Sequence, residues 1–319
     1  MNFKKRAVAK TLVNFLAWAA FAVLVTACTR SGPPSPDSAE PRNPGWGTFA
    51  LPGFYSTYAL SFPGRGQGFA SGERGKFYTF KNKAWHVSPF PSQEQIFSMD
   101  FASPRKGVAV GSAGTVVVFE KGRWQKVPCD TWRDIMDIFM INENEGWAVG
   151  ENSTLFHYRN NTWTKVPAPE LGYLTRVYFT SPENGWAVGN NGLILHYRDS
   201  SWHKAASPTT KNLYGVCFTS PENGWAVGAF GTILRFNKDR WQLTQSPVEK
   251  HLLDIHFTKN GQGYAAGASG TVLVYRRDKW QEVYSPTEKA LYTVTTDPDH
   301  HLWVTGKGGK IFRIKISNL

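Results

Sequence analysis

Residues 178–205 read YFTSPENGWAVGNNGLILHYRDSSWHKA, and residues 217–244 read CFTSPENGWAVGAFGTILRFNKDRWQLT. The two stretches are copies of one unit displaced by 39 residues. The same step runs through a ladder of glycines and a ladder of tryptophans, namely Gly72, Gly111, Gly150, Gly189, Gly228, Gly267 and Gly306, and Trp46, Trp85, Trp124, Trp163, Trp202, Trp241 and Trp280. Two ladders with one period indicate that the chain contains seven copies of a single unit.

Each copy consists of short β-branched and aromatic runs separated by clusters of Gly, Pro, Asn, Asp and Ser. Runs of this kind between turn signals are strands, and the unit has room for four of them. In one copy we expect strand A at residues 213–218, strand B at 224–228, strand C at 231–236 and strand D at 241–244. The sequence therefore predicts an all-β fold, a seven-bladed β-propeller with four antiparallel strands per blade.

Two further positions of the repeat carry structural information. An apolar residue recurs in strand A and predicts the core between blades: Leu60, Met99, Ile138, Val177, Val216, Ile255 and Val294. A second glycine follows the strand B glycine by three residues, at Gly75, Gly114, Gly192, Gly231, Gly270 and Gly309, with Ser153 as the exception. This pair predicts a tight B–C turn that requires positive φ. No helix follows it, so it is not a phosphate-binding loop.

The ring closure is also predicted from the ladder. The last strand C, at residues 310–316, is not followed by a strand D, whereas Trp46 lies one period before Trp85. The segment around it, GWGTFALP, matches later D strands such as RWQLTQSP. We therefore expect residues 45–51 to pair as the outermost strand of the last blade, which leaves no free edge at the junction of the termini.

The first 44 residues have a different composition. Lys4, Lys5, Arg6 and Lys10 precede an apolar stretch at residues 11–27 that is a little short for a spanning helix. The segment VTAC resembles a bacterial lipobox, which predicts a lipoprotein signal peptide at residues 1–27 and diacylation of Cys28; an uncleaved signal anchor is the alternative. Residues 28–44, rich in Pro and Ser, are expected to form a disordered tether, and residues 45–319 the propeller. Either anchor places the propeller outside the cytoplasm, on a membrane.

Cysteine and histidine usage points to neither disulfides nor metal. Cys129 and Cys217 fall in blades too far apart for a bridge, so both are expected to be unpaired. His157 and His196 share a strand C register on adjacent blades, where equivalent positions diverge outward. No metal-ligand spacing is present, and we expect no metal and no cofactor.

The propellers that bear on catalysis are the sialidases, whose repeats carry an Asp box in the C–D turn. This chain keeps the tryptophan at that place but shortens the turn to forms such as RDSSW and NKDRW. The arginine cluster and the tyrosine nucleophile that sialidase chemistry needs are not identifiable from one blade to the next. A carbohydrate-active or ligand-binding propeller, using its channel mouth, therefore remains the alternative to a non-enzymatic function.

Strand A also places polar residues near the channel: Asp100, Asp137, Arg176, Asp254 and His256. Asp137 and Arg176 share a register on neighbouring blades. We expect a salt bridge between them, and a role in blade packing is favoured over a ligand site.

The charge pattern is the main pointer to a partner. The chain carries a net charge of +12, and removal of residues 1–27 would leave +8. Because strands alternate in direction, the A–B and C–D turns share one face of the ring. The C–D turns carry an excess of cations: Lys81, Lys83, Lys121, Arg123, Arg159, Arg198, Lys238, Arg240, Arg276, Arg277 and Lys279, against Glu120, Asp199, Asp239 and Asp278. Such a rim attracts an acidic protein segment or anionic lipid head groups, or it merely keeps the protein soluble. Nucleic acid is not expected for an exported protein.

The GWAVGxxGTIL core, the strand D tryptophan, the seven repeats and the lipobox together resemble the photosystem II stability and assembly factor family, over residues 45–319. The resemblance implies a non-enzymatic chaperone or scaffold that, in phototrophs, is tied to the thylakoid on its lumenal side and holds a precursor polypeptide. A basic arginine patch is associated with that role. Phototroph members tend to carry an insertion between blades, whereas this chain keeps its period unbroken, and the repeat core also occurs in many non-photosynthetic bacteria.

The sequence thus favours a monomeric, lipid-anchored propeller of the cell envelope, facing the periplasm or, in a phototroph, the thylakoid lumen. It would bind a protein client or a membrane protein complex and help to assemble it. The predicted partner-binding residues come from the rim argument alone: Arg159, Arg198, Lys238, Arg240, Arg276, Arg277 and Lys279. No catalytic residue is predicted.

Overall fold

The computed structural model describes residues 43–53 and 55–319. The predicted signal peptide, Cys28 and all but the last two residues of the predicted tether lie outside the described residues. Among the residues described, no helix is long and apolar enough to cross a membrane. Asn43–Leu319 form one compact unit.

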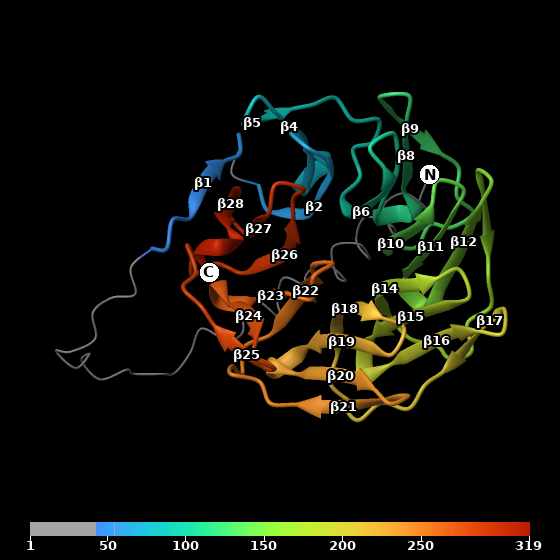
Figure 1. The fold of residues 1–319 in the computed structure, drawn as a ribbon. Helices are drawn as coiled ribbons and strands as arrows, with labels where there is room; N and C mark the ends of the chain where they lie inside the picture. Colours follow the sequence, from blue (N-terminus) through green and yellow to red (C-terminus); the bar gives the residue numbers. More distant parts are fainter. Residues whose placement is uncertain (1–42, 54) are drawn as a thin grey trace, which may run out of the picture. The chain divides into compact units, whose positions relative to one another are not determined.

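This unit is a ring of seven four-stranded antiparallel sheets, as the repeat predicted (Figure 1). Blade 1 contains β2 (Thr57–Gly64), β3 (Gln67–Gly72), β4 (Phe77–Lys81) and β5 (Ala84–Val87); blade 2 contains β6 (Ile96–Ser103), β7 (Lys106–Gly111), β8 (Val116–Glu120) and β9 (Arg123–Val127); blade 3 contains β10 (Ile135–Asn142), β11 (Glu145–Gly150), β12 (Thr154–Arg159) and β13 (Thr162–Lys165); blade 4 contains β14 (Leu174–Ser181), β15 (Asn184–Gly189), β16 (Ile194–Arg198) and β17 (Ser201–Lys204). Blade 5 contains β18 (Leu213–Ser220), β19 (Asn223–Gly228), β20 (Ile233–Asn237) and β21 (Arg240–Thr244); blade 6 contains β22 (Leu252–Phe257), β23 (Gly263–Gly267), β24 (Val272–Arg276) and β25 (Lys279–Glu282); blade 7 contains β26 (Leu291–Thr296), β27 (His301–Gly306), β28 (Lys310–Lys315) and β1 (Gly47–Ala50).

The glycine pair of each repeat forms the B–C turn, and its two members serve different purposes. In blade 2 the turn is the 3₁₀ segment η2 (Ser112–Gly114), where Gly114 has φ +66° as predicted. Gly111 has an extended backbone, but a Cβ there would lie 1.9 Å from the carbonyl oxygen of Gln95. The first glycine is therefore required by close backbone approach, and the second by left-handed conformation. Ser153, the exception, also has positive φ, and its hydroxyl donates to the carbonyl of Glu170 at 2.6 Å.

The tryptophan ladder packs each strand D onto the preceding blade. Trp202 of blade 4 meets Trp147 of blade 3 edge to face, with ring centroids 5.5 Å apart and an interplanar angle of 84°. Trp241 meets Trp186 at the next seam in the same geometry. Edge-to-face pairs of this size contribute beyond the area they bury. The period of the tryptophans is thus the period of the inter-blade contact.

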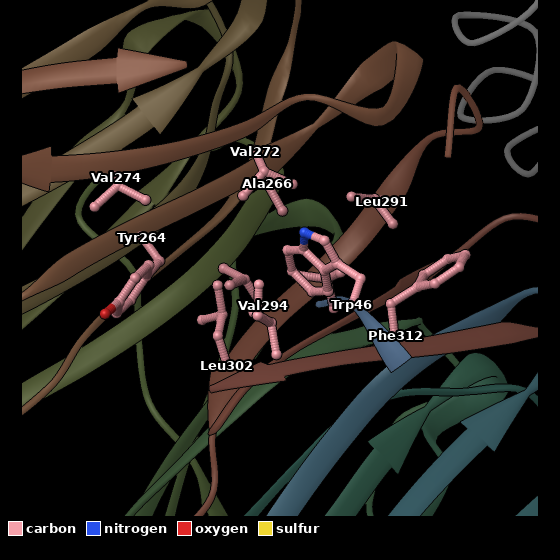
Figure 2. Packing of buried hydrophobic residues seen from close by; sticks show 11 residues of the cluster. Trp46, Tyr264, Ala266, Val272, Val274, Leu291, Val294, Leu302 and Phe312 are labelled. Atoms are coloured by element: carbon pink, nitrogen blue, oxygen red, sulfur yellow. The ribbon is translucent and has the colours of Figure 1, made fainter. Parts of the chain in front are cut away.

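The ring closes through the N-terminal strand, which confirms the predicted closure. β1 pairs antiparallel with β28, with Gly47 opposite Arg313 and Ala50 opposite Lys310, and Figure 1 shows the two strands side by side. Trp46 is 6% exposed and packs among residues of blades 6 and 7, including Val294 and Phe312 (Figure 2). Its indole N–H donates to the carbonyl of Tyr284 at 3.3 Å. Residues far apart in sequence therefore share one core.

Candidate functional site

The basic rim is built on two-residue C–D turns. In blade 4, Asp199 and Ser200 both have positive φ, and Arg198 is paired with Ser201 across the turn. Two successive left-handed residues are the pattern of a type I′ hairpin, which suits Asn, Asp and Gly. The turns of blades 3, 5 and 6 repeat this conformation at Asn160 and Asn161, Lys238 and Asp239, and Arg277 and Asp278. The cations of the rim thus sit at fixed places beside tight turns.

The seven predicted partner-binding residues are all exposed and all lie at C–D turns: Arg159, Arg198, Lys238, Arg240, Arg276, Arg277 and Lys279. Arg159 forms an ion pair with Glu145, Nη2 to Oε1 at 3.0 Å. Within residues 43–53 and 55–319, the other six form no ion pair. Arg276 and Lys279 even stand directly opposite each other across their hairpin. Like charges in that position are destabilising, so this part of the rim is not arranged for stability.

The same face also carries acidic residues that the rim argument did not count. The A–B turns share this face and lie nearer the axis; their acids are Glu143, Glu145, Glu183, Glu222, Asp297 and Asp299, against Arg65, Arg105, Lys106 and Lys259. Lys106 pairs with Glu120, and Arg65 with Asp299. The unpaired positive charge is therefore concentrated at the outer edge of the ring and not over the channel mouth.

The channel contains the predicted salt bridge, and Arg176 extends it further. Arg176 lies 3.3 Å from Asp137 of blade 3 and 2.9 Å from Asp254 of blade 6, which is two blades away in the other direction. Gly215 occupies the same register on the intervening blade and has no side chain to block the guanidinium. One arginine thus joins three blades across the axis.

Carboxylates of strand A tie three blades to the blade that follows each of them. Asp137 accepts a hydrogen bond from the backbone N–H of Val177, and Asp254 accepts one from Val294, both at 2.9 Å. Asp100 accepts from Met140 at 2.7 Å. Burial raises the pKa of Asp100 to about 6, and it raises the pKa of Asp137 against the opposing effects of Arg176 and Ser98. These acids hold blades together, as the packing hypothesis proposed.

Two further reactive groups of strand A, the Cys217 thiol in the core between blades 5 and 6 and the His256 imidazole, are held in unreactive forms. Burial raises the pKa of the Cys217 thiol to about 12 and lowers the pKa of His256 to about 4. At neutral pH the thiol is protonated and the imidazole is neutral, with its Nε2 2.9 Å from the Thr296 hydroxyl. A buried thiol without thiolate character is a poor nucleophile. Cys129 is also unpaired, and burial raises its pKa to about 11.

The two histidines that share a strand C register serve packing. His157 stacks on Trp147 with centroids 4.2 Å apart, and His196 stacks on Trp186 at 3.8 Å. Burial, followed by repulsion from Arg198, lowers the pKa of His196 to about 4. Among the described residues, no group of three or more His, Cys, Asp or Glu is placed to hold a metal ion.

A second ring of repeated residues lies where strand A begins, toward the face of the B–C turns and D–A connections. Five of its members are half-buried, and Met136 and Thr175 are buried. The second residue of every strand A falls at an irregularity in the A–B pairing, and these residues form what we call the collar: Tyr58, Phe97, Met136, Thr175, Tyr214, Leu253 and Tyr292. Tyr58 stacks on Tyr292 with centroids 5.4 Å apart and meets Phe97 edge to face. Counting in steps of 39 from Tyr58 finds every residue of the collar. The β-bulges that take these residues out of the pairing between strands A and B, however, leave no mark in the sequence.

Three large apolar side chains are exposed on connections of the collar's face. Trp132 is 69% exposed, Leu171 79% and Phe230 56%. The Arg133 guanidinium lies 5.1 Å from the Trp132 ring, and the Lys211 amine 5.7 Å from the Phe230 ring. The two faces thus differ: one has cations at its outer edge, and the other has apolar side chains.

Comparison with known proteins gives matches at the level of structure. No family model and no curated protein matches the sequence. The structure of YCF48 bound to D1 peptide superposes with a TM-score of 0.71 at 19% identity, covering 86% of this chain and 98% of that chain. YCF48 from Cyanidioschyzon merolae gives 0.71 at 14% identity, covering 85% and 99%, and the WD40 β-propeller domain of Doa1 gives 0.72 at 11% identity, covering 86% and 99%. At these identities the likeness shows the fold, a seven-bladed propeller that resembles YCF48.

Proposed function

We propose that this protein is a non-enzymatic scaffold, tethered to a membrane of the cell envelope, which binds a segment of a protein client and assists its assembly. The observation that carries the proposal is the contrast between the channel and the rim. In the channel, Arg176 forms ion pairs with Asp137 and Asp254, and all three side chains are largely buried. At the rim, six cations are exposed and no ion pair holds them within the part of the chain described. Such a surface is suited to binding an acidic partner.

The fold likeness supports the same proposal. YCF48, to which the chain is similar in structure, is bound to a peptide in one of the matching structures. The repeat core and the lipobox resemble the photosystem II assembly factor family. A D1 peptide is therefore the first probe of client binding, although the cell of origin sets whether the client is a photosystem subunit or another membrane protein.

The membrane tether is a separate part of the proposal. Diacylation of Cys28 would hold the propeller at a bilayer, since two acyl chains anchor a protein stably. Mass spectrometry of the mature N-terminus tests this directly. An intact Met1 would rule out the lipoprotein and leave the uncleaved signal anchor.

Client binding is tested by charge reversal at the rim. The variant Arg276→Glu/Arg277→Glu/Lys279→Glu is expected to weaken binding of the D1 peptide, or of the client captured by cross-linking in the envelope, and to reduce its salt dependence. The control Lys289→Glu/Lys307→Glu/Lys310→Glu makes the same change of charge on the face of the B–C turns and D–A connections. Equal binding by the wild-type chain and both variants would refute the rim as the client surface.

A further inference from the structure

A groove opens at the outer edge of the ring between blades 4 and 5. It has a volume of about 590 Å³ and runs from the strands of blade 4 to the C–D turn of blade 5. Trp186, Phe236 and Trp241 form its apolar floor, and all three are almost fully buried. Its volume falls in the range of small ligand sites. The groove is large enough for a side chain of a partner.

Two arginines of the basic rim stand at its mouth. Arg198 comes from the C–D turn of blade 4, and Arg240 from that of blade 5. Both are exposed, and neither forms an ion pair within the described part of the chain. Asp239 is the one carboxylate of the lining, and Lys204 pairs with Glu170, which lies outside it. Arginine forks bind carboxylates with two parallel hydrogen bonds, which favours an acidic occupant.

The groove follows from the repeat and not from a local irregularity. Between blades 1 and 2 the same register positions form a groove of about 650 Å³, with Phe69, Phe119 and Trp124 as its floor. Lys81 replaces Arg198 at its mouth, and Arg123 replaces Arg240. The copy between blades 4 and 5 is therefore distinguished by an arginine on both sides of the mouth.

We propose that the groove between blades 4 and 5 binds an extended acidic segment of a partner polypeptide. An aromatic or aliphatic side chain of that segment would rest on the floor of Trp186, Phe236 and Trp241, and neighbouring carboxylates would pair with Arg198 and Arg240. The inference rests on the proposed function and assigns client recognition to this seam of the rim. It takes a peptide rather than a lipid surface because the apolar floor is recessed behind the two cations.

The test uses the full chain in detergent and a fluorescent peptide of alternating glutamate and phenylalanine. The variant Arg198→Glu/Arg240→Glu is expected to lower its affinity at least about tenfold, since each charge-assisted bond that is lost counts for roughly that factor. The control Lys289→Glu/Lys307→Glu makes the same charge change on the opposite face, at exposed residues outside the basic rim, and it is expected to alter affinity less than about threefold. Equal losses in both variants would overturn the groove in favour of a diffuse effect of net charge.

A second variant tests the apolar seat without changing charge. Ala206 lies exposed on the lip of the groove, so Ala206→Trp should obstruct the cavity and lower the affinity at least about tenfold. If Ala206→Trp binds the peptide with unchanged affinity, the groove does not hold a side chain of the peptide. Vesicles of phosphatidylglycerol are the third arm. If the wild-type chain binds these vesicles but not the peptide, and Arg198→Glu/Arg240→Glu loses the vesicle binding, the occupant is a lipid surface and not a peptide. If the client is captured equally by Arg198→Glu/Arg240→Glu and by the wild-type chain, the groove fails while the proposed function stands.

Discussion

Charged side chains are buried and paired at the axis of this propeller, whereas at its rim most of them are exposed and form no ion pair with the described residues. At the axis, Arg176 contacts carboxylates of two other blades, and Asp137 and Asp254 accept backbone hydrogen bonds as well. At the rim, Arg276 faces Lys279 across a hairpin, and neither forms an ion pair with any of the residues that the structure describes. Both sets of residues recur at fixed places of one 39-residue unit. The difference teaches that charge near the axis serves assembly of the ring, whereas charge at the rim is left for a partner.

The largest effect is expected where the outer edge of the ring contributes to the core, at the N-terminal strand β1. Trp46 and β1 supply the outermost strand of blade 7. Trp46→Ala is expected to lower the free energy of unfolding by about 3–5 kcal/mol, because it removes a buried indole and leaves a cavity. Deleting residues 43–52 should cost more, because the edge of β28 also loses its partner. Thermal melts of both variants measure the effect.

An unchanged melting temperature after the deletion would refute closure by β1. The matched control is Leu243→Ala, because Leu243 lies on the outer strand of blade 5 and is 60% exposed. It should change stability by less than about 0.5 kcal/mol. A similar loss of stability in Leu243→Ala and in Trp46→Ala would mean that the outer strands of all blades stabilise the ring alike and that closure by β1 contributes nothing extra.

The ring, its blade number and its closure were predictable because each follows from local spacing repeated without a slip. The bridge between Asp137 and Arg176 was predictable from shared register on adjacent strands. The contact with Asp254 was not, since it depends on the reach of an arginine past Gly215, two blades along the ring. The collar was missed because the bulge at each strand A changes which residues alternate inward. The acids of the A–B turns were visible in the sequence, and the pair of Glu145 with Arg159 follows from their opposed places on β11 and β12, whereas the pair of Arg65 with Asp299 joins blades 1 and 7 and needed the ring geometry.

Removing the central arginine tests the axis itself. Arg176→Leu leaves Asp137 and Asp254 buried without their cation, so we expect a loss of about 3–5 kcal/mol at pH 7. The loss should shrink as the pH falls, because burial raises the pKa of Asp137 and protonation relieves this carboxylate once Arg176 is gone. The combined variant Arg176→Leu/Asp137→Asn/Asp254→Asn should recover part of it. Denaturant melts at pH 5 and pH 7 measure these differences.

Arg240→Leu is the rim control for the same loss of an arginine, and it should be close to neutral. Should Arg176→Leu prove as mild as this control, the network at the axis would not support the ring, and the contrast between axis and rim would fail.

The pH dependence of stability sharpens the comparison at a single buried group. Burial lowers the pKa of His256 to about 4, whereas in the unfolded chain it has its ordinary value near 6.5. The unfolded state therefore binds more protons between these two values, and the stability supplied by neutral His256 is lost as the pH falls through 6.5. The loss from pH 7 to pH 5 is about 2 kcal/mol. His256→Gln should remove it, as seen by denaturant melts at the two values.

Asp100 acts in the opposite direction over part of this range. Burial raises its pKa to about 6, so its contribution to stability is present at low pH and is lost as the pH rises through 6. The effect of His256 must therefore be taken as the difference between the wild-type chain and the variant. His86→Gln changes an exposed histidine on β5 and should leave the pH profile unaltered. A His256→Gln profile parallel to that of the wild type would contradict a buried, neutral imidazole.

The smallest expected effect lies at the rim and has the opposite sign. Arg276→Glu places a carboxylate directly across the hairpin from Lys279, where two cations now face each other. Opposite charges at such a pair stabilise by about 0.2–1 kcal/mol relative to a neutral pair, and like charges destabilise, so the variant should be slightly more stable than the wild-type chain. The same substitution removes a cation from the rim and should weaken client binding. A gain in stability coupled to a loss of binding is the signature of a residue kept for function at a structural cost.

Arg276→Gln provides the control, since it removes the repulsion without creating a new pair. In stability and in client binding it should fall between the wild-type chain and Arg276→Glu. If Arg276→Glu lowered stability, or left binding intact, the opposed cations of this hairpin would have no functional meaning, and the rim would be no more than a solvated edge.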